Sequence, residues 1–211
     1  MTIDADFAVA SALRRRMNEL AAHSCPPSTL ARFSQLRCAW ASASPGLRKA
    51  VLWRHFDLDR FGPSDAVLTN IDIAVLPCHA LRRLMLFRAL YSRVDALRRC
   101  VDRRSRQWFI EQLGQSGWEW ILSRWAFPSV LTLLPTGDDH LLSWYSDGWY
   151  RLYLDQIWAW QGVAYLAANI AQVSVEEQPD FKAPTSADQR SAAFLNEWRD
   201  WTDPILEVEA A

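Results

Sequence analysis

Histidines and clustered acids are the side chains of this sequence that could perform acid–base or metal chemistry, and their spacing supports neither. The 211 residues include four histidines, which lie far apart and outside any HExxH motif: His23, His55, His79 and His140. The densest cluster is Asp138-Asp139-His140, but its acids fall in a turn, where aspartate is favoured for backbone reasons. We therefore predict no catalytic residue and expect that the protein is not an enzyme.

Metal and cofactor sites also lack their sequence patterns. The four cysteines, Cys25, Cys38, Cys78 and Cys100, include no CxxC pair, so neither a zinc knuckle nor a dithiol redox centre is indicated. The glycine-rich loops that bind nucleotide phosphates and the GxSxG elbow of hydrolases are absent as well. The sequence predicts no metal and no cofactor.

Arginine is the residue type whose distribution indicates binding. The net charge is only −1, yet residues 1–106 hold 18 Lys or Arg against 9 Asp or Glu, a net charge of +9. Residues 107–211 hold 5 against 15, which gives −10. Such a split indicates either two faces for two partners or two halves that attract each other.

One long helix beginning at Pro77 is predicted to position the arginines. At about 100° per residue, one arc of this helix is apolar and contains Leu86, Phe87, Leu90, Val94, Leu97 and Val101. Six arginines lie outside the arc: Arg82, Arg88, Arg93, Arg99, Arg103 and Arg106. Asp95 and Asp102 can pair with Arg99 and Arg106 at i,i+4 spacing, so some positive charge is left over. We predict that this basic face binds an acidic partner; the acidic half of the same chain is the alternative.

Tryptophan provides a second candidate for partner contact, because ten of the twelve tryptophans lie in the second half of the chain. Trp118 with Trp120, and Trp158 with Trp160, form pairs whose members point about 200° apart on a helix. Either these helices are buried on two sides, which is the simpler interpretation, or one member of each pair anchors a partner. Trp120 and Trp160 are the candidates for that role.

Periodicity in the chain predicts a mainly α fold, an irregular multi-helix bundle with a small N-terminal helical subdomain. Helices are expected over Val9–Leu20, over Leu30–Trp40, from Ser44-Pro45, over Trp108–Leu113, over Trp118–Trp125 after a break at Gly114–Gly117, over Tyr150–Ala171, and over Phe194–Trp201 with an end before Pro204. A turn at residues 61–65 and a polar stretch at residues 175–185 separate three segments. These are a subdomain over residues 1–62, a helical core over 63–174, and a linker with a C-terminal helix over 175–211.

The sequence predicts a soluble cytoplasmic protein. Its first twenty residues mix charged side chains into a short apolar pattern, unlike a signal peptide. The most apolar stretch, Ile157–Ala171, is too short to span a bilayer and contains Gln161 and Asn169.

Three segments resemble a known family. Residues 75–84, VLPCHALRRL, are followed by Leu97–Asp102, LRRCVD, and by Gln112-Leu113-Gly114. They resemble the cytosolic accessory protein of bacterial type III secretion systems, the YscK, PscK and OrgA group. The chain length and the Trp-rich second half look most like the Hrp-type members of that group from plant-associated bacteria.

The resemblance implies a non-enzymatic adaptor of the sorting platform, the cytoplasmic assembly at the base of the secretion apparatus that helps recruit export substrates. It implies two partners, the pod protein related to flagellar switch components and the cytoplasmic domain of the inner-membrane ring protein, with the ATPase-stator protein as a further candidate. Membrane association would then occur only through partners, and no nucleic acid is expected. The alternative from another class is a nucleic-acid-binding regulator that places the same arginines on phosphates.

Overall fold

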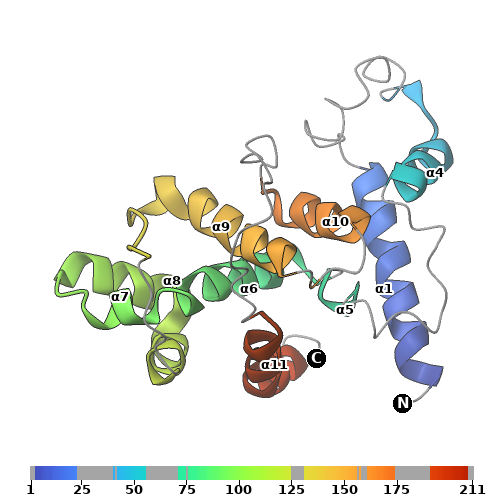
Figure 1. The fold of residues 1–211 in the computed structure, drawn as a ribbon. Coiled ribbons are helices and arrows are strands. Elements are labelled where there is room, and N and C mark those ends of the chain that lie inside the picture. The colour runs from blue at the N-terminus through green and yellow to red at the C-terminus, as the bar shows by residue number, and fades with distance from the viewer. Residues whose placement is uncertain are drawn as a thin grey trace. The chain divides into compact units, whose positions relative to one another are not determined.

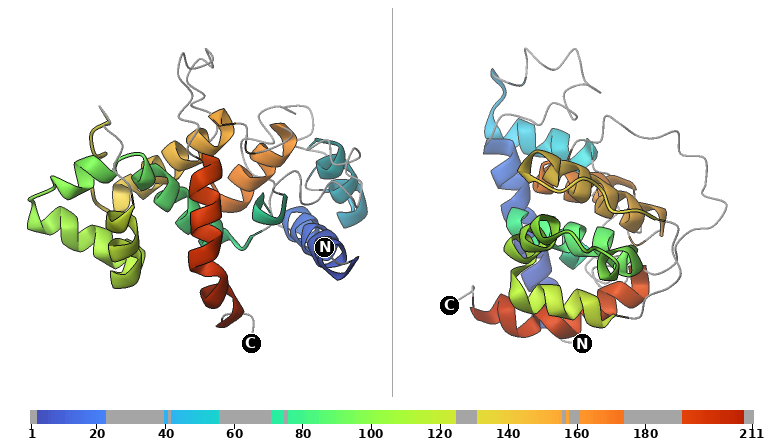
Figure 2. Two further views of the ribbon diagram at one scale, coloured as in Figure 1. Left: turned by 60° about the horizontal axis from the view of Figure 1, so that its bottom comes forward. Right: turned by 90° about the vertical axis from the view of Figure 1, so that its left-hand side faces the viewer.

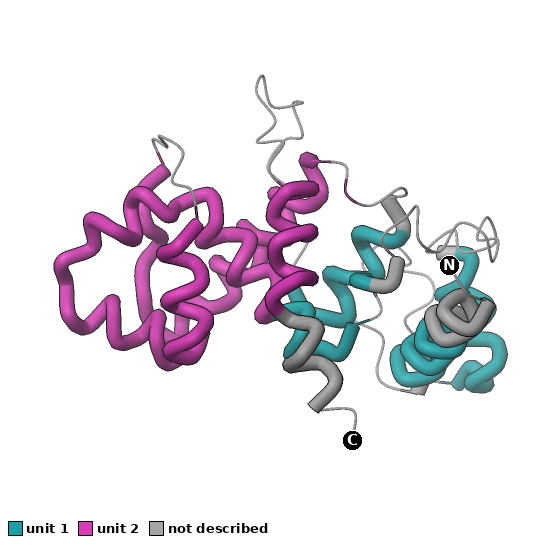
Figure 3. The backbone as a smooth tube through the Cα atoms, turned by 90° about the horizontal axis from the view of Figure 1, so that it is seen from below, with its two compact units in different colours: residues 1–82, 158–181 teal, residues 83–157, 182–211 magenta. Residues whose placement is uncertain are grey.

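The computed structural model describes residues 3–22, 40, 42–55, 71–74, 76–124, 131–155, 157, 161–173 and 191–208 (Figures 1 and 2). Within these residues the regular secondary structure is helical and no strand occurs, so the predicted mainly α fold is confirmed. The chain forms two compact units, each built from two stretches of sequence: unit 1 from residues 1–82 and 158–181, and unit 2 from residues 83–157 and 182–211 (Figure 3). The predicted division at residues 62 and 174 follows other limits and stays a prediction.

Some predicted features lie outside the described residues. They are most of the helix over Leu30–Trp40, the turn at residues 61–65, the polar stretch at residues 175–185, and Trp125, Trp158 and Trp160.

Unit 1 contains α1 (Ile3–Ala22), which packs against α4 (Pro45–His55) (Figure 1). α1 buries Leu13, Met17 and Ala21, which recur once per turn on a single face. Leu52 of α4 is buried to the same degree. The amphipathic helix predicted over Val9–Leu20 is therefore confirmed, and α1 extends beyond it at both ends.

The start of α4 follows the predicted capping signal. Pro45 occupies the first helical position, where a missing N–H leaves no hydrogen bond unmade. The Ser44 hydroxyl accepts a hydrogen bond from the Leu47 N–H at 3.3 Å. Arg48 donates through Nε to the carbonyl oxygen of Trp40 at 2.9 Å, and its guanidinium lies 5.9 Å from the centroid of that ring. The helix predicted to begin at Ser44-Pro45 is confirmed.

The rest of unit 1 comprises α5 (Ile71–Ala74), the first residues of α6 (Cys78–Tyr91), and α10 (Gln161–Ala171), with α5 packed against α10. All described side chains of α10, from Val163 to Ala171, are buried. A helix that is apolar all round is expected to be enclosed in this way.

The single helix predicted over Tyr150–Ala171 is wrong, because two helices share that segment. α9 (Leu141–Leu154) begins before it and ends within it, and α10 starts only at Gln161. The end of α9 is closed by a hydrogen bond from the Ile157 N–H back to the Leu152 carbonyl at 3.2 Å, a C-terminal capping pattern. Both segments are apolar, so periodicity alone could not locate the break.

Unit 2 comprises the rest of α6, α7 (Val94–Arg98), α8 (Arg103–Ser123), the 3₁₀-helix η4 (Asp138–His140), α9 and α11 (Ser191–Val208). The long helix predicted from Pro77 is wrong, since α6, α7 and α8 divide it. After α6 the Arg93 N–H bonds to the Leu90 carbonyl at 2.8 Å, which closes a tight turn. Before α8 the side chain of Asp102 accepts a hydrogen bond from the Ser105 N–H at 2.7 Å and caps the new helix.

Five of the six residues of the predicted apolar arc are buried: Leu86, Phe87, Leu90, Val94 and Leu97. Burial is not confined to that arc, because every residue from Leu84 to Val94 is buried. Val101, the sixth, lies between α7 and α8 and is 91% exposed. The arc therefore ends where α7 ends.

The predicted break at Gly114–Gly117 is confirmed in the backbone of α8. Gly114 has φ 74° and ψ 162°, values that leave the helical region and suit glycine. Helical geometry resumes after it and continues to Ser123. Gly117 lets the ring of Phe87 approach closely, because a Cβ there would lie 2.8 Å from that ring's Cζ.

The apolar stripe predicted for the C-terminal helix was Phe194, Trp198 and Trp201. In α11 Phe194 and Trp198 are buried, and the half-buried Trp201 stacks on Trp120. The predicted end before Pro204 is wrong, since α11 continues to Val208. Proline's fixed φ is compatible with helical dihedrals, so its missing N–H and local crowding weaken the helix without always ending it.

Aromatic side chains in the described part of unit 2 form two large clusters. One joins α8 and α9: the Phe109 ring stacks on Trp118 at 6.0 Å and meets Trp144 edge-on at 5.6 Å between centroids. The other joins α6, α8 and α11: the Trp120 ring lies 5.4 Å from Phe87 and 5.2 Å from Trp201. Such pairs add to the stabilisation from buried area. They account for much of the tryptophan in the second half of the chain.

α6 and α9 approach each other closely at Gly148. A Cβ at this position would lie 1.8 Å from the Met85 carbonyl oxygen and 2.9 Å from the Met85 Cα. These are backbone atoms, which cannot turn aside as the end of a flexible side chain could. Gly148 is therefore required for the two helices to lie at this distance.

We expect Gly148→Ala to lower the free energy of unfolding by at least about 2 kcal/mol, because the two helices must separate to admit the methyl group. Thermal or denaturant unfolding monitored by circular dichroism measures this loss. Gly46→Ala is the matched control, since a Cβ at Gly46 of α4 meets no atom within 4 Å. That variant should be neutral or more stable by up to about 1 kcal/mol. Equal stability of the two variants would contradict the close approach.

Candidate functional site

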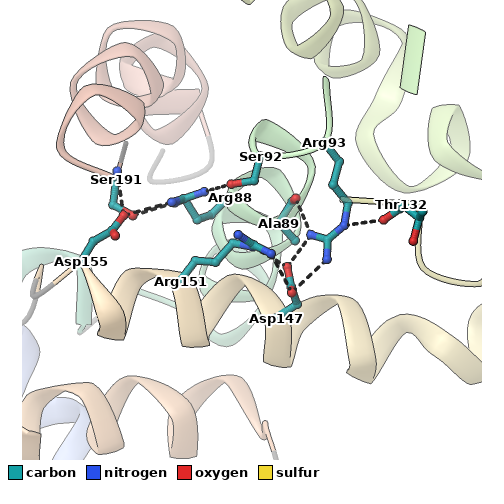
Figure 4. Close-up of polar contacts among 9 residues, drawn as sticks. All are labelled: Arg88, Ala89, Ser92, Arg93, Thr132, Asp147, Arg151, Asp155 and Ser191. Carbon is teal, nitrogen blue, oxygen red and sulfur yellow. Dashed lines mark hydrogen bonds and ion pairs between the residues drawn. The ribbon is translucent and has the colours of Figure 1, made fainter. Parts of the chain in front are cut away.

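Two of the six arginines predicted to form one exposed basic face are buried inside unit 2. Arg88 is 0% exposed and Arg93 is 3% exposed. Both lie in the region where α6 ends, and both are held by residues from the acidic second half of the chain (Figure 4). The prediction of a single exposed face is therefore wrong. For these two arginines, the alternative of an acidic recipient within the same chain is the one observed.

Arg93 has hydrogen-bond partners for all three of its guanidinium nitrogens. Nη1 and Nη2 donate to the two carboxylate oxygens of Asp147 at 2.6 and 3.0 Å. Nη1 also donates to the Ala89 carbonyl, and Nε donates to the Thr132 carbonyl, each at 2.9 Å. Arg151, one turn after Asp147 on α9, donates to the same carboxylate at 2.8 and 3.2 Å (Figure 4). Asp147 therefore serves two cations.

The electrostatic surroundings of Asp147 favour its charged form. Burial by itself would raise the pKa of this carboxyl, but hydrogen bonds from Arg93 and Arg151, together with their charges, outweigh it. The pKa of Asp147 is therefore lower than the ordinary value of an aspartate.

Arg88 joins three helices of unit 2. Its Nη2 donates to Asp155, the residue that follows α9, at 3.0 Å. Its Nε donates to the hydroxyl of Ser191, the first residue of α11, at 2.6 Å, and its Nη1 donates to the Ser92 hydroxyl at 2.5 Å. The Ser191 N–H also donates to Asp155 at 3.0 Å, so the carboxylate caps the start of α11 (Figure 4).

Two more arginines, Arg82 of the predicted face and Arg98 outside it, bind carbonyl oxygens at helix ends. In unit 1, Arg82 donates to the Ala171 carbonyl at the end of α10 and to the Gln172 side chain, each at 2.8 Å. In unit 2, Arg98 donates to the Leu122 and Arg124 carbonyls at the end of α8, each at 2.7 Å. Cations at these positions also complement the negative end of the helix dipole.

The predicted i,i+4 pairs differ in outcome. Arg99 pairs with Asp95 at 2.6 Å, as predicted. The pairing of Asp102 with Arg106 is wrong, because the Asp102 side chain caps α8 instead. Hydrogen bonds from the Ser105 side chain and backbone lower the pKa of Asp102, which keeps the cap charged.

Three exposed arginines, Arg103, Arg104 and Arg106, form what we call the arginine cluster, in the first turn of α8. In the described part of the chain, none of their side chains makes a hydrogen bond or ion pair, although Arg104 lies close enough to Asp102 to act on it electrostatically. Arg103 and Arg106 belong to the predicted set, whereas Arg104 does not, because its angle on the predicted long helix fell within the apolar arc. Arg104 was missed because the predicted helix passed through the position at which α8 begins.

A cleft of about 540 Å³ lies beside the arginine cluster within unit 2. Its walls come from the first turns of α8 and from the segment before α9: Arg103, Arg104, Gln107, Trp108, Glu111, Thr136, Gly137 and Asp138. The Trp108 Nε1–H donates to an Asp138 carboxylate oxygen at 3.2 Å, and the hydroxyls of Ser105 and Thr136 are 3.1 Å apart. These contacts join the two walls.

The tryptophan candidates do not add to this surface. Trp118 and Trp120 are 6% and 8% exposed, so burial on two sides is confirmed for that pair. The Trp120 ring stacks on Trp201 and carries the Arg124 guanidinium 4.8 Å from its centroid. Trp160 lies outside the described residues and stays a prediction.

Among the described residues, no three His, Cys, Asp or Glu side chains are placed to hold a metal ion. Within Asp138-Asp139-His140 all three residues are exposed, and Asp138 accepts the Trp108 hydrogen bond. Cys78 and Cys100 are free, half-buried thiols.

The fold defines a mainly α protein of two compact units, and one of them has an arginine cluster that makes no ion pair to the described residues. A family model described as bacterial type III secretion protein (HrpB4) matches residues 3–201. The chain therefore belongs to the HrpB4 family of bacterial type III secretion proteins, and the resemblance to type III secretion components is confirmed at that level. Comparisons with curated proteins and with solved structures gave no match. None of the helices in the described part of the chain has the length and apolar character needed to cross a membrane.

Replacing Asp147 tests the ion pairs of Arg93 and Arg151. Because the folded pKa of Asp147 is below its unfolded value, the carboxylate contributes stability that is present above about pH 4 and is lost as the pH falls further. We expect Asp147→Asn to lower the free energy of unfolding at neutral pH and to reduce its decline between about pH 5 and pH 3. Denaturant unfolding at a series of pH values measures both effects. Asp139→Asn, in exposed η4, is the control, and an unaltered acid decline in Asp147→Asn would refute the assignment.

A double-mutant cycle tests the Arg88–Asp155 pair. Either single variant, Arg88→Met or Asp155→Leu, leaves one buried charge unpaired and should cost about 3–5 kcal/mol. The double variant removes both charges and should cost clearly less than the sum of the single losses. Free energies of unfolding from urea titrations provide the cycle. Additive losses would show that the two charges do not stabilise each other.

Proposed function

We propose that this HrpB4-family protein is a non-enzymatic adaptor of the type III secretion sorting platform, located in the cytoplasm at the base of the secretion apparatus. The observation that carries the proposal is the family match over residues 3–201. The resemblance of three sequence segments to the YscK, PscK and OrgA group supports the finer assignment.

As partners we propose the pod protein related to flagellar switch components and the cytoplasmic domain of the inner-membrane ring protein. The ATPase-stator protein is a further candidate. Two compact units in one chain support a two-ended adaptor, because each unit offers its own surface. Contact with the membrane would then be indirect, through the ring protein.

The alternative function, a regulator that binds nucleic acid, has less support than the adaptor, because few of the arginines it would need are available. A phosphate backbone needs several cations that are free to contact it. Arg88 and Arg93 are buried in ion pairs, and Arg82 and Arg98 bind helix ends within the chain. Of these arginines, the arginine cluster remains available to bind phosphates. The cleft beside it also contains two carboxylates, Glu111 and Asp138.

The adaptor is expected to hold the pod protein and the ring protein's cytoplasmic domain at the same time. Mixing the three purified proteins should give one ternary complex by size-exclusion chromatography with light scattering, and omitting the adaptor should abolish the complex. An unrelated acidic protein of similar charge, in place of the pod protein, controls for non-specific attraction. Failure to bind either partner, or competition between the two for the adaptor, would contradict the proposal.

A further inference from the structure

We propose that the cleft beside the arginine cluster is a docking site for an acidic segment of a platform partner, whose carboxylates pair with Arg103 and Arg104. The inference rests on the proposed function and adds the place and the chemistry of one contact. It is carried by the position of the arginine cluster, by the shape of the cleft and by the mixture of groups that line it.

The arginine cluster lies at a position where positive charge is electrostatically unfavourable. Arg103, Arg104 and Arg106 occupy the first turn of α8, whose helix dipole is positive at this end, and no acidic residue shares that turn. The three cations also repel one another. They are exposed and make no hydrogen bond or ion pair to the part of the chain that the structure describes, so the folded chain gains little from them. Charge kept at an unfavourable position indicates a role outside folding.

Two of these arginines line the cleft, next to an ordered aromatic side chain. Arg103 and Arg104 line it together with Trp108, whose indole is fixed by its hydrogen bond to Asp138. The contact between the Ser105 and Thr136 hydroxyls joins the two sides, so the walls are in place before a ligand arrives. At about 540 Å³, the cleft has room for several side chains of a peptide.

The groups around the cleft favour a peptide over a polyanion. A guanidinium can hold a carboxylate by two parallel hydrogen bonds, which makes an aspartate or glutamate side chain a specific partner for Arg103 or Arg104. Glu111 and Asp138 in the same walls would repel a continuous row of phosphates more than a segment whose carboxylates are separated by neutral side chains. Val101, two residues before Arg103 and 91% exposed, offers an apolar contact for a side chain of the peptide. The site therefore fits an acidic segment that also carries an apolar side chain.

Charge reversal separates this role from a structural one. In Arg103→Glu/Arg104→Glu, two anions replace two cations at the positive end of α8, so the melting temperature should stay the same or rise. Binding of a short fluorescent peptide that carries several glutamates around one leucine should weaken at least about tenfold by anisotropy. Arg14→Glu/Arg15→Glu, which reverses two exposed arginines of α1, is the matched control and should bind like the parent. A peptide with glutamines in place of the glutamates should bind none of the three proteins.

The same variants are then mixed with the pod protein and with the ring protein's cytoplasmic domain. The inference predicts that Arg103→Glu/Arg104→Glu loses one of these partners while Arg14→Glu/Arg15→Glu keeps both. If the parent binds both and the cluster variant binds both equally well, the inference is overturned while the adaptor proposal stands. If the parent binds neither protein but the peptide result holds, the adaptor proposal fails and the acidic-peptide site remains. Absence of peptide binding by the parent, or tighter binding of duplex DNA through the same arginines, would also overturn the inference.

Discussion

The burial of Arg88 and Arg93 at the end of α6 is the constraint on which unit 2 depends. A guanidinium removed from water is costly unless its donors are paired, and in the interior only a close carboxylate with additional acceptors can offset that cost. Asp147 and Asp155 supply those carboxylates from α9, and Ser191 adds the start of α11. The two ion pairs thus fix two sequence-distant helices against α6. Gly148, one residue after Asp147, lets α9 come close enough for the pairs to form.

The same constraint explains why the chain turns after α6. If α6 continued as a helix through residue 93, the Arg93 side chain would point in a different direction. The tight turn instead places this side chain between the Ala89 and Thr132 carbonyls and Asp147. Only partners far along the chain make this turn favourable, and Asp147 lies 54 residues beyond Arg93. Tertiary electrostatics here outweigh a local sequence that contains no proline or glycine to end the helix.

The sequence allowed the fold class and several helices to be predicted, because their signals are local. Leu13 and Met17 mark one face of α1, Ser44 and Pro45 start α4, and Gly114 breaks α8. The break of the long helix before α8 was missed because Asp102 was interpreted as one half of a surface ion pair, although an aspartate three residues before Ser105 is also a helix cap. The basic face failed with that helix, since its six arginines were placed by angle on a helix that the chain does not form. The charge split was informative about the fold, but which arginines meet which carboxylates depends on contacts between distant segments.

The arginines of residues 82–106 divide according to what the fold can supply. The arginines of α6, of α7 and of the turns that follow them face carbonyl oxygens or carboxylates of their own unit. Their positive charge is therefore balanced within that unit. At Arg103 the chain starts a new helix, α8, whose first-turn N–H groups require hydrogen-bond acceptors. Asp102, the acidic residue next to the arginine cluster in the sequence, already serves as the cap of that helix. No carboxylate of the described chain completes the arginine cluster with an ion pair, although Asp138 and Glu111 lie in the adjoining cleft. The overall charge near zero therefore conceals a local excess of positive charge, and its natural complement is a carboxylate brought by another molecule. Because α8 is held by the buried aromatic clusters, a partner would meet this charge on a rigid element and would lose little affinity to ordering it.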